Sequence, residues 1–174
     1  TSKPLKILVH GSLPPPLGGM ATYVQDYMNS PISERIRILF SRSTVLRWVY
    51  TTKGLFNKCL RVLNVPCITA VWLVMLIFRR PDVAHLHTSS HAGFFIRAGL
   101  GVMARVLLVP SVLHIHGARF KEFYRESSRP IRWLIRRLIQ GNSQIIALSE
   151  KWREFFESIG ISPGKITVMT NCVF

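Results

Sequence analysis

Histidines are the most concentrated reactive side chains in this sequence. Five of the six fall within or just after two short apolar segments: His85, His87, His91, His114 and His116. Alternate residues of a strand share a face, so His85 lies beside His87 and His114 beside His116. His116 precedes Gly117 at a strand tip, where an imidazole can position a substrate and stabilise charge. His116 is therefore the candidate catalytic residue, whereas His85 and His114 are better explained as core histidines.

Metal and nucleophile chemistry have weaker support. A zinc site built from His87, His91 and His116 is conceivable, but no acidic or cysteine ligand accompanies these histidines. The motifs Gly-x-Ser-x-Gly and Gly-Lys-Ser are absent, and the eight acids are scattered, with no carboxylate pair for glycoside hydrolysis. The three cysteines lack metal-type or paired spacing, which predicts reduced thiols in a cytoplasmic protein. We expect no metal and no resident cofactor.

A glycine pair lies between the first expected strand and the first expected helix. Residues 6–11 are short and apolar, Gly18 and Gly19 follow, and a helix is expected from Met20 to about Met28. Glycines before a helix let the backbone approach a ligand, and the free N–H groups of the first turn attract a phosphate. The alternative is that the two glycines only permit a tight turn.

Apolar segments alternate with amphipathic helical ones along the chain. The expected strands span residues 6–11, 35–40, 83–87, 111–116, 144–148 and 165–169. The expected helices span residues 20–28, 58–80, 94–107, 130–141 and 150–159, with a short helix or loop at 119–126. This alternation predicts right-handed βαβ crossovers and an α/β, Rossmann-like, doubly wound parallel sheet. The 174 residues are expected to form one domain.

Three local details of these helices can be tested against the structure. Pro66 is expected to interrupt the 58–80 helix. Ser149 is a plausible N-cap for the 150–159 helix. The 130–141 helix is expected to bury one apolar stripe: Ile131, Leu134, Ile135, Leu138 and Ile139.

Ligands of a doubly wound sheet bind outside the carboxyl ends of its strands. Four candidate features fall at such ends: Gly18 and Gly19, residues 88–91, His116 and Gly117, and Ser149 and Glu150. Their convergence is the functional signal in this sequence.

The net charge of +15 points to an anionic partner. Residues 35–81 contain bases and aromatics and no acid, which suits an anionic membrane surface or a lipid-linked phosphate. Nucleic acid is the alternative partner. The simplest explanation is that these bases form a solvated face whose acidic counterpart lies elsewhere. The most apolar stretch, 65–78, is shorter than a membrane span, so we expect a buried or membrane-facing helix.

Five motifs together resemble the N-terminal domain of the retaining GT-B glycosyltransferases of group 1, the family-four type. They are Pro16-Leu17-Gly18-Gly19 with Tyr23, residues 81–87, Leu113-His114-Ile115-His116-Gly117, Ile146-Ala147-Leu148-Ser149-Glu150, and residues 166–171. The resemblance implies two Rossmann-like domains facing across a cleft. Residues 1–174 would be the acceptor-side half, and a C-terminal nucleotide-sugar domain would be missing from this sequence. Asn171-Cys172-Val173-Phe174 departs from the Asn-Gly-Val-Asp usual in the family, and we expect that the sequence is a piece of a longer protein.

The resemblance also implies roles for individual residues. Gly18 and Gly19 would approach the donor diphosphate, His116 would lie near the transferred sugar, and Ser149 and Glu150 would border the cleft. Because the family retains anomeric configuration without a demonstrated protein nucleophile, His116 would position the reactants. The expected acceptor-side residues are Thr88, Ser89, His91, Gly117, Arg119 and Lys121. For Arg119 and Lys121 the argument is only their charge beside His116, and surface solvation explains them nearly as well.

The sequence thus predicts half of a transferase that moves a sugar from a nucleotide-sugar to a saccharide or lipid-linked acceptor of a polysaccharide or glycolipid. We expect it to be cytoplasmic and peripheral on the inner face of the cell membrane, to bind no nucleic acid, and to be inactive without its second half. The alternative is a stand-alone Rossmann-like module that binds nucleic acid or a phosphorylated ligand without catalysis. A dehydrogenase-like cofactor domain is disfavoured because Gly-x-Gly-x-x-Gly is absent.

Overall fold

Six short apolar segments form one parallel sheet in the computed structural model, which describes residues 4–14, 18–31, 35–44, 53–117 and 119–170. The strands are β1 (Lys6–Gly11), β2 (Arg37–Arg42), β3 (Val83–Thr88), β4 (Ser111–Ile115), β5 (Gln144–Ala147) and β6 (Ile166–Val168). Their order is β2-β1-β3-β4-β5-β6, and each neighbouring pair is parallel. The predicted α/β, Rossmann-like sheet is confirmed.

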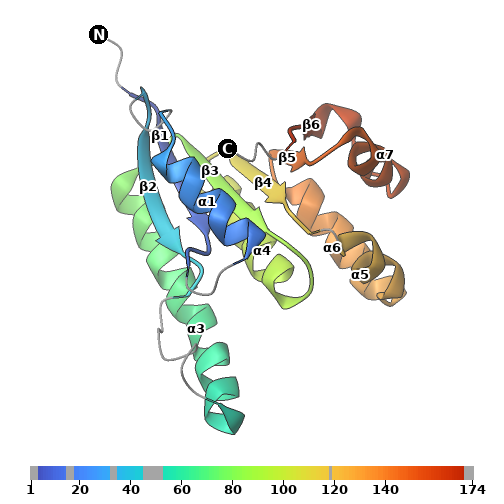
Figure 1. Cartoon of the computed structure of the whole chain (residues 1–174), viewed down its shortest axis with the longest axis horizontal. Coiled ribbons are helices and arrows are strands. Elements are labelled where there is room, and N and C mark those ends of the chain that lie inside the picture. The colour runs from blue at the N-terminus through green and yellow to red at the C-terminus, as the bar shows by residue number, and fades with distance from the viewer. Residues whose placement is uncertain (1–3, 15–17, 32–34, 45–52, 118, 171–174) are drawn as a thin grey trace.

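Helices connect the strands on both sides of the sheet. They are α1 (Gly19–Asn29), α3 (Gly54–Val74), the π-helical turn η2 (Met75–Arg79), α4 (Ala92–Val106), α5 (Phe120–Glu126), α6 (Arg129–Gly141), α7 (Glu150–Ser158) and the 3₁₀ turn η3 (Pro163–Lys165). Figure 1 shows α1 across one face of the sheet, with α3 and α4 behind it. The first turns of α3 extend beyond the carboxyl ends of β1 and β2 and so stand beside the edge where ligands bind (Figure 1).

Helix α3 runs through Pro66, so the predicted interruption is wrong. A proline within a helix removes one backbone hydrogen bond. The helix nevertheless buries Ile68 and Trp72 in the core, followed by Leu76 of η2, and the Trp72 indole N–H donates to the Leu100 carbonyl at 3.0 Å. Burial of these side chains outweighs the lost hydrogen bond.

Tertiary contacts also shift two other predicted features. Strand β2 lies two residues later than predicted, because its pairing with β1 runs from Lys6 opposite Arg37 to Gly11 opposite Arg42. In α6 only Ile135 and Ile139 of the predicted stripe are buried, Leu138 is half-buried, and Ile131 and Leu134 are exposed. The helix packs on α4 through a narrower face than its amphipathic pattern suggests.

The α4–α6 contact is close. A Cβ at Gly101 of α4 would overlap the Oδ1 of Asn142, and one at Gly141 would overlap Val102. Asn142 is buried and donates to the Ala98 and Leu138 carbonyls. The glycines at this crossing let α4 and α6 pack closely.

Candidate functional site

The strand order places a switch point at the carboxyl ends of β1 and β3. From β1 the chain moves to β2 on one side, and from β3 it moves through β4 and β5 on the other. The connecting helices therefore lie on opposite faces and leave a crevice between β1 and β3. Residues of a ligand site in this sheet are expected to lie beside this crevice.

Four histidines and two tyrosines form a cluster between the sheet and α1. We call His85, His87, His114, His116, Tyr23 and Tyr27 the histidine cluster. The His114 and His116 rings stack with their centres 3.9 Å apart, and the His85 and His87 centres are 4.2 Å apart. Tyr23 contacts the His116 ring at 4.8 Å. The predicted pairing of these histidines on one face is confirmed.

His116 is held by its neighbours in the cluster. His87 Nδ1 and His116 Nε2 form a hydrogen bond of 2.9 Å, and the His116 backbone N–H donates to the Thr88 carbonyl. Gly117 follows directly, and a Cβ there would lie 3.2 Å from the Ser89 backbone, so the ends of β3 and β4 touch. The fully buried His87 therefore fixes the ring of the half-buried His116 at the strand tip.

Burial keeps the histidines of the cluster uncharged at neutral pH. Desolvation lowers the pKa of His85 and of His116 to about 4, with the nearby His116 as a second cause for His85. Desolvation, then neighbouring histidines, lowers the pKa of His114 to about 2 and that of His87 well below its usual value. A neutral His116 can donate and accept hydrogen bonds, but with so low a pKa it is a weak general base.

Several ring nitrogens of the cluster are suited to metal binding. Among the described residues, five have no hydrogen-bond partner: His85 Nε2, His87 Nε2, both nitrogens of His114, and His116 Nδ1. Ligand nitrogens of His85, His87 and His114 lie within 4.8 Å of one another. A tetrahedral zinc ion with Zn–N distances of about 2.1 Å needs nitrogens about 3.4 Å apart, so the rings would have to converge. Of the sequence-based zinc trio, only His87 is one of these three, whereas His91 and His116 are not.

The two glycines lie open at the start of α1. Neither adopts a positive φ, and Gly18 has extended backbone with φ of −179°. A Cβ at either position would meet no described protein atom within 4 Å. The described surroundings thus do not require glycine for a tight turn, and no described residue fills the space next to either Cβ position. Tyr23, one turn into α1, links this loop to His116.

The predicted acceptor-side residues are dispersed. Thr88 is buried and its hydroxyl donates to the Gly93 carbonyl at 3.5 Å, while His91 is exposed and packs on Phe123. Lys121 Nζ donates to the Lys151 carbonyl at 3.2 Å and lies over the Trp152 ring. The structure thus gives Lys121 partners on α7, whereas Ser89 and Gly117 lie together beside His116.

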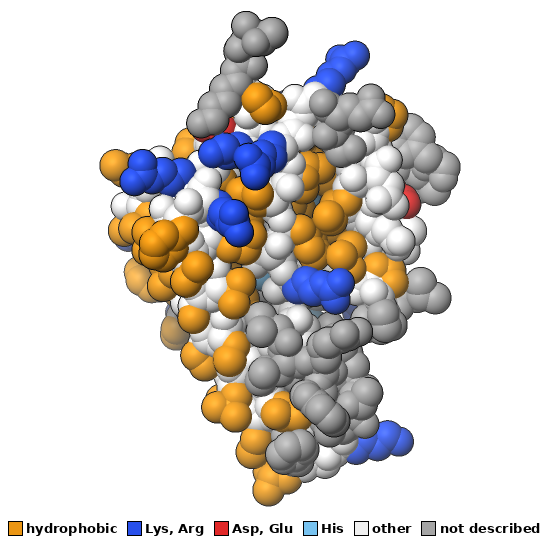
Figure 2. All heavy atoms as spheres, turned by 90° about the vertical axis from the view of Figure 1, so that its left-hand side faces the viewer, with side chains coloured by type: hydrophobic (Ala, Val, Ile, Leu, Met, Phe, Trp, Pro, Cys, Tyr) orange, Lys and Arg blue, Asp and Glu red, His pale blue; other side chains and the backbone are white. Residues whose placement is uncertain are grey.

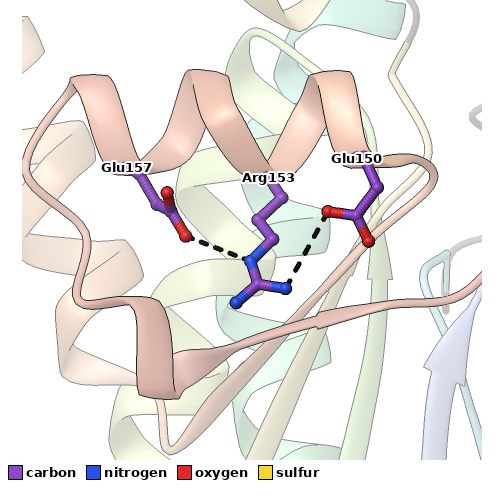
Figure 3. Close-up of polar contacts among 3 residues, drawn as sticks. All are labelled: Glu150, Arg153 and Glu157. Atoms are coloured by element: carbon purple, nitrogen blue, oxygen red, sulfur yellow. Dashed lines mark hydrogen bonds and ion pairs between the residues drawn. The ribbon is translucent and has the colours of Figure 1, made fainter.

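Ser149 and Glu150 lie at the start of α7. Ser149 is the N-cap residue, as predicted, although its side chain makes no capping hydrogen bond. Glu150 pairs with Arg153 at 3.8 Å, and Arg153 Nε donates to Glu157 at 3.0 Å (Figure 3). Exposed pairs of this kind contribute little to stability.

The sequence analysis missed a second polar group beside the crevice. His10, the one histidine outside the two histidine-rich segments, is buried at the end of β1, and Arg97 Nη2 donates to the Ser12 hydroxyl at 3.3 Å. A pocket of about 480 Å³ lies against both residues. The sequence signal that could have found this group was a polar end of β1, with His10 and Ser12, together with a basic residue, Arg97, in the first turns of α4.

Together these features define a Rossmann-like domain with a polar cluster at the switch point of its sheet. Residues 18–172 match the model of the family described as "Glycosyl transferase 4-like domain". The chain belongs to this family. A search of curated protein sequences found no significant match.

Solved structures confirm the fold. Anabaena Alr3699/HepE in complex with UDP-glucose superposes with a TM-score of 0.61 at 18% identity, over 96% of this chain and 44% of that one. The lipopolysaccharide outer core galactosyltransferase WaaB, in apo form, gives 0.57 at 17% identity, over 97% and 46%. A UDP-N-acetylglucosamine 2-epimerase gives 0.60 at 15% identity, over 97% and 49%. The chain therefore spans less than half the length of each of these proteins.

Proposed function

We propose that this chain is the acceptor-binding half of a retaining glycosyltransferase that takes a sugar from a nucleotide-sugar and works on the cytoplasmic face of a membrane. The observation that carries the proposal is the His87–His116 hydrogen bond at the switch point, with Tyr23 joining it to the open Gly18–Gly19 loop. The family match supports the reaction class. The UDP-glucose bound by HepE supports a nucleotide-sugar donor.

In the proposed reaction, the bond between the sugar's anomeric carbon and the diphosphate breaks, and an acceptor hydroxyl oxygen bonds to that carbon on the same face. The hydroxyl proton leaves with the departing diphosphate. The N–H groups at the start of α1 would attract the diphosphate. The neutral His116 would hydrogen-bond the sugar and hold it in register with the acceptor, and His87 would fix the ring of His116. No step requires a metal or a protein nucleophile.

The outer face of α3 supports the membrane part of the proposal. One described helix, Asn57–Arg79, is long and apolar enough to cross a membrane, and little of its most apolar part is buried. Length alone therefore does not exclude a span, contrary to the sequence-based argument from residues 65–78. The inner side of the helix packs in the core through Ile68, Trp72 and Leu76, which favours a helix that lies on a membrane.

The exposed side of this helix is apolar and basic. Its exposed hydrophobic residues, which we call the α3 face, are Leu55, Val62, Leu63, Val71, Val74, Ile77 and Phe78. Phe78 is 76% exposed and is followed by the exposed Arg79 and Arg80. Figure 2 shows hydrophobic side chains down this side of the molecule, with Lys and Arg side chains among them. Apolar insertion and attraction to anionic lipids would act together there.

Sugar transfer is tested with the longer protein that contains this chain, purified from its source cells and analysed first by intact mass. We expect about twice the mass of this chain, because the matched structures are about twice as long. Labelled UDP-sugars and a lipid extract of the same cells should yield a labelled glycolipid. Anomeric configuration is read by NMR. A full-length product of 174 residues, or a product with inverted configuration, would contradict the proposal.

Membrane binding is tested by sedimentation with vesicles. At low salt, the chain should bind vesicles rich in anionic phospholipid and bind neutral phosphatidylcholine vesicles much more weakly. Ile77→Gln with Phe78→Gln should weaken binding, whereas Met169→Gln, which alters an exposed residue of the β6 end, should not. Equal binding to both vesicle types contradicts the membrane proposal. Tight, steeply salt-dependent binding to oligonucleotides would favour the nucleic-acid module instead.

A further inference from the structure

A pocket beside His10 lies at the carboxyl edge of the sheet. It lies between the first half of α3, the first turns of α4 and the ends of β1 and β2, and its volume is about 480 Å³. This is within the usual range for ligand pockets. It lies on the α3–α4 side of the sheet, whereas the histidine cluster lies on the α1 side.

The polar part of the pocket is basic. Arg61 and Arg97 line it, and none of the described lining residues is acidic. Arg61 Nε donates to the side-chain oxygen of Asn57 at 2.8 Å, and Arg97 Nη2 to the Ser12 hydroxyl at 3.3 Å. These two hydrogen bonds hold the guanidinium groups of Arg61 and Arg97 at the pocket. Such a pair suits a phosphate, because guanidinium binds phosphate oxygens in a bidentate manner.

His10 adds a buried neutral group to the same pocket. Its Nδ1 lies 3.2 Å from the Ser41 hydroxyl, and its Nε2 has no hydrogen-bond partner among the described residues. Burial, and second the charge of Arg97, lower the pKa of His10 to about 3, so the ring is neutral. When the Ser41 hydroxyl donates to Nδ1, the proton of the ring is on Nε2 and can be donated to a ligand oxygen.

The apolar part of the pocket continues onto the α3 face. Val62, Val65 and Ile68 of α3 line the pocket. Val62 is also 70% exposed and belongs to the α3 face. One ligand could therefore place an anionic group between the two arginines and leave an apolar chain along the outside of α3.

We propose that this pocket binds the phosphate of a lipid-linked acceptor, with Arg61 and Arg97 on the phosphate and the lipid chain leaving past Val62 along the α3 face. This inference deepens the proposed function and rests on it, because the bound lipid phosphate is an acceptor only if the protein transfers a sugar. The Arg97–Ser12 hydrogen bond places the phosphate next to the loop that leads from β1 to Gly18 and Gly19. A sugar carried by that phosphate would then lie at the switch point, near the donor.

The test measures binding of three probes to the chain without a donor: farnesyl phosphate, farnesol and inorganic phosphate. Binding is followed by the fluorescence of tryptophan, since Trp72 of α3 is 5.4 Å from the His10 ring. Farnesyl phosphate should bind at least about tenfold more tightly than either of the others, because it alone satisfies both parts of the pocket. Equal affinity for farnesol and farnesyl phosphate would overturn the proposal, as would equal affinity for inorganic phosphate.

Matched variants separate the pocket from the general positive charge. Arg61→Gln should weaken farnesyl phosphate binding about tenfold, and Arg97→Gln similarly. Arg125→Gln removes an exposed arginine of α5 and should change the affinity less than about twofold. Because Arg61 is exposed, its variant should keep the fold, and circular dichroism checks this. Equal losses of farnesyl phosphate affinity in Arg61→Gln and Arg125→Gln would contradict phosphate binding in this pocket.

The outcomes also separate this inference from the proposed function. If the longer protein transfers sugar to a lipid-free saccharide and farnesyl phosphate does not bind, the pocket proposal fails and the transferase stands. If farnesyl phosphate binds in an Arg61-dependent manner and no sugar is transferred, the pocket stands and the proposed function fails.

Discussion

Acid should unfold this protein at a mildly acidic pH, because four buried histidines and the half-buried His116 are kept neutral in the fold. His10, His85, His114 and His116 have pKa values of about 4 or lower, and that of His87 is well below its usual value. In the unfolded chain each has a pKa of about 6.5. The unfolded state therefore binds more protons below pH 6.5, and stability falls as the pH falls.

The size of the effect follows from proton linkage. Between pH 7 and pH 5.5, each histidine with a folded pKa of 4 or lower removes about 1.3 kcal/mol from the free energy of unfolding. The four histidines with such pKa values remove about 5 kcal/mol, and His87, whose pKa is also lowered, adds to this loss. The total is comparable to the whole stability of a typical domain, about 5–15 kcal/mol. We therefore expect the unfolding midpoint in urea to fall steeply between these pH values, with loss of the fold near pH 5.

Urea titrations followed by tryptophan fluorescence at pH 7.0, 6.5, 6.0 and 5.5 measure this slope. His85→Leu removes one buried imidazole and should lower the slope near pH 5.5 by about 1.2 kcal/mol per pH unit. His91→Gln replaces an exposed imidazole and should leave it unchanged. A stability that is constant from pH 7 to pH 5.5 would refute the reasoning, as would equal changes of slope in the two variants.

Three further predictions concern catalysis, metal and the core. In the longer protein, His116→Ala should lower kcat at least about a hundredfold. His87→Leu should lower kcat about tenfold with little change in KM, because His87 only orients the His116 ring. Steady-state kinetics measure both parameters, and a change confined to KM contradicts the assigned roles. Prolonged dialysis against EDTA should leave sugar transfer unchanged, with metal content followed by mass spectrometry; loss of activity that zinc restores would show that the histidine cluster needs its ion. Trp72→Ala should lower the free energy of unfolding by about 3–5 kcal/mol, since the side chain is fully buried and its N–H donates to Leu100; a loss below about 1 kcal/mol in urea unfolding would contradict its place in the core.

The order of elements was predictable because each strand and most helices carry their own local signal. Residues 6–11 form β1 as predicted, and α7 begins at Glu150 as predicted. Pro66 misled the analysis of α3, since the propensity of one residue is outweighed by packing of the whole helix on the sheet. In α6 the burial of Ile131 and Leu134 depended on how much of the helix its neighbours cover, which no local pattern contains.

The sequence by itself determined the parallel α/β architecture, the basic charge of residues 35–81 and the sharing of a face by alternate histidines, because these depend on composition and short-range periodicity. Only the tertiary structure decided that His87 bonds His116, that Tyr23 closes on both, and that Arg61, Arg97 and His10 share a pocket. These contacts join residues from separate strands and helices. Their distances depend on strand order and helix packing, which are properties of the whole folded chain.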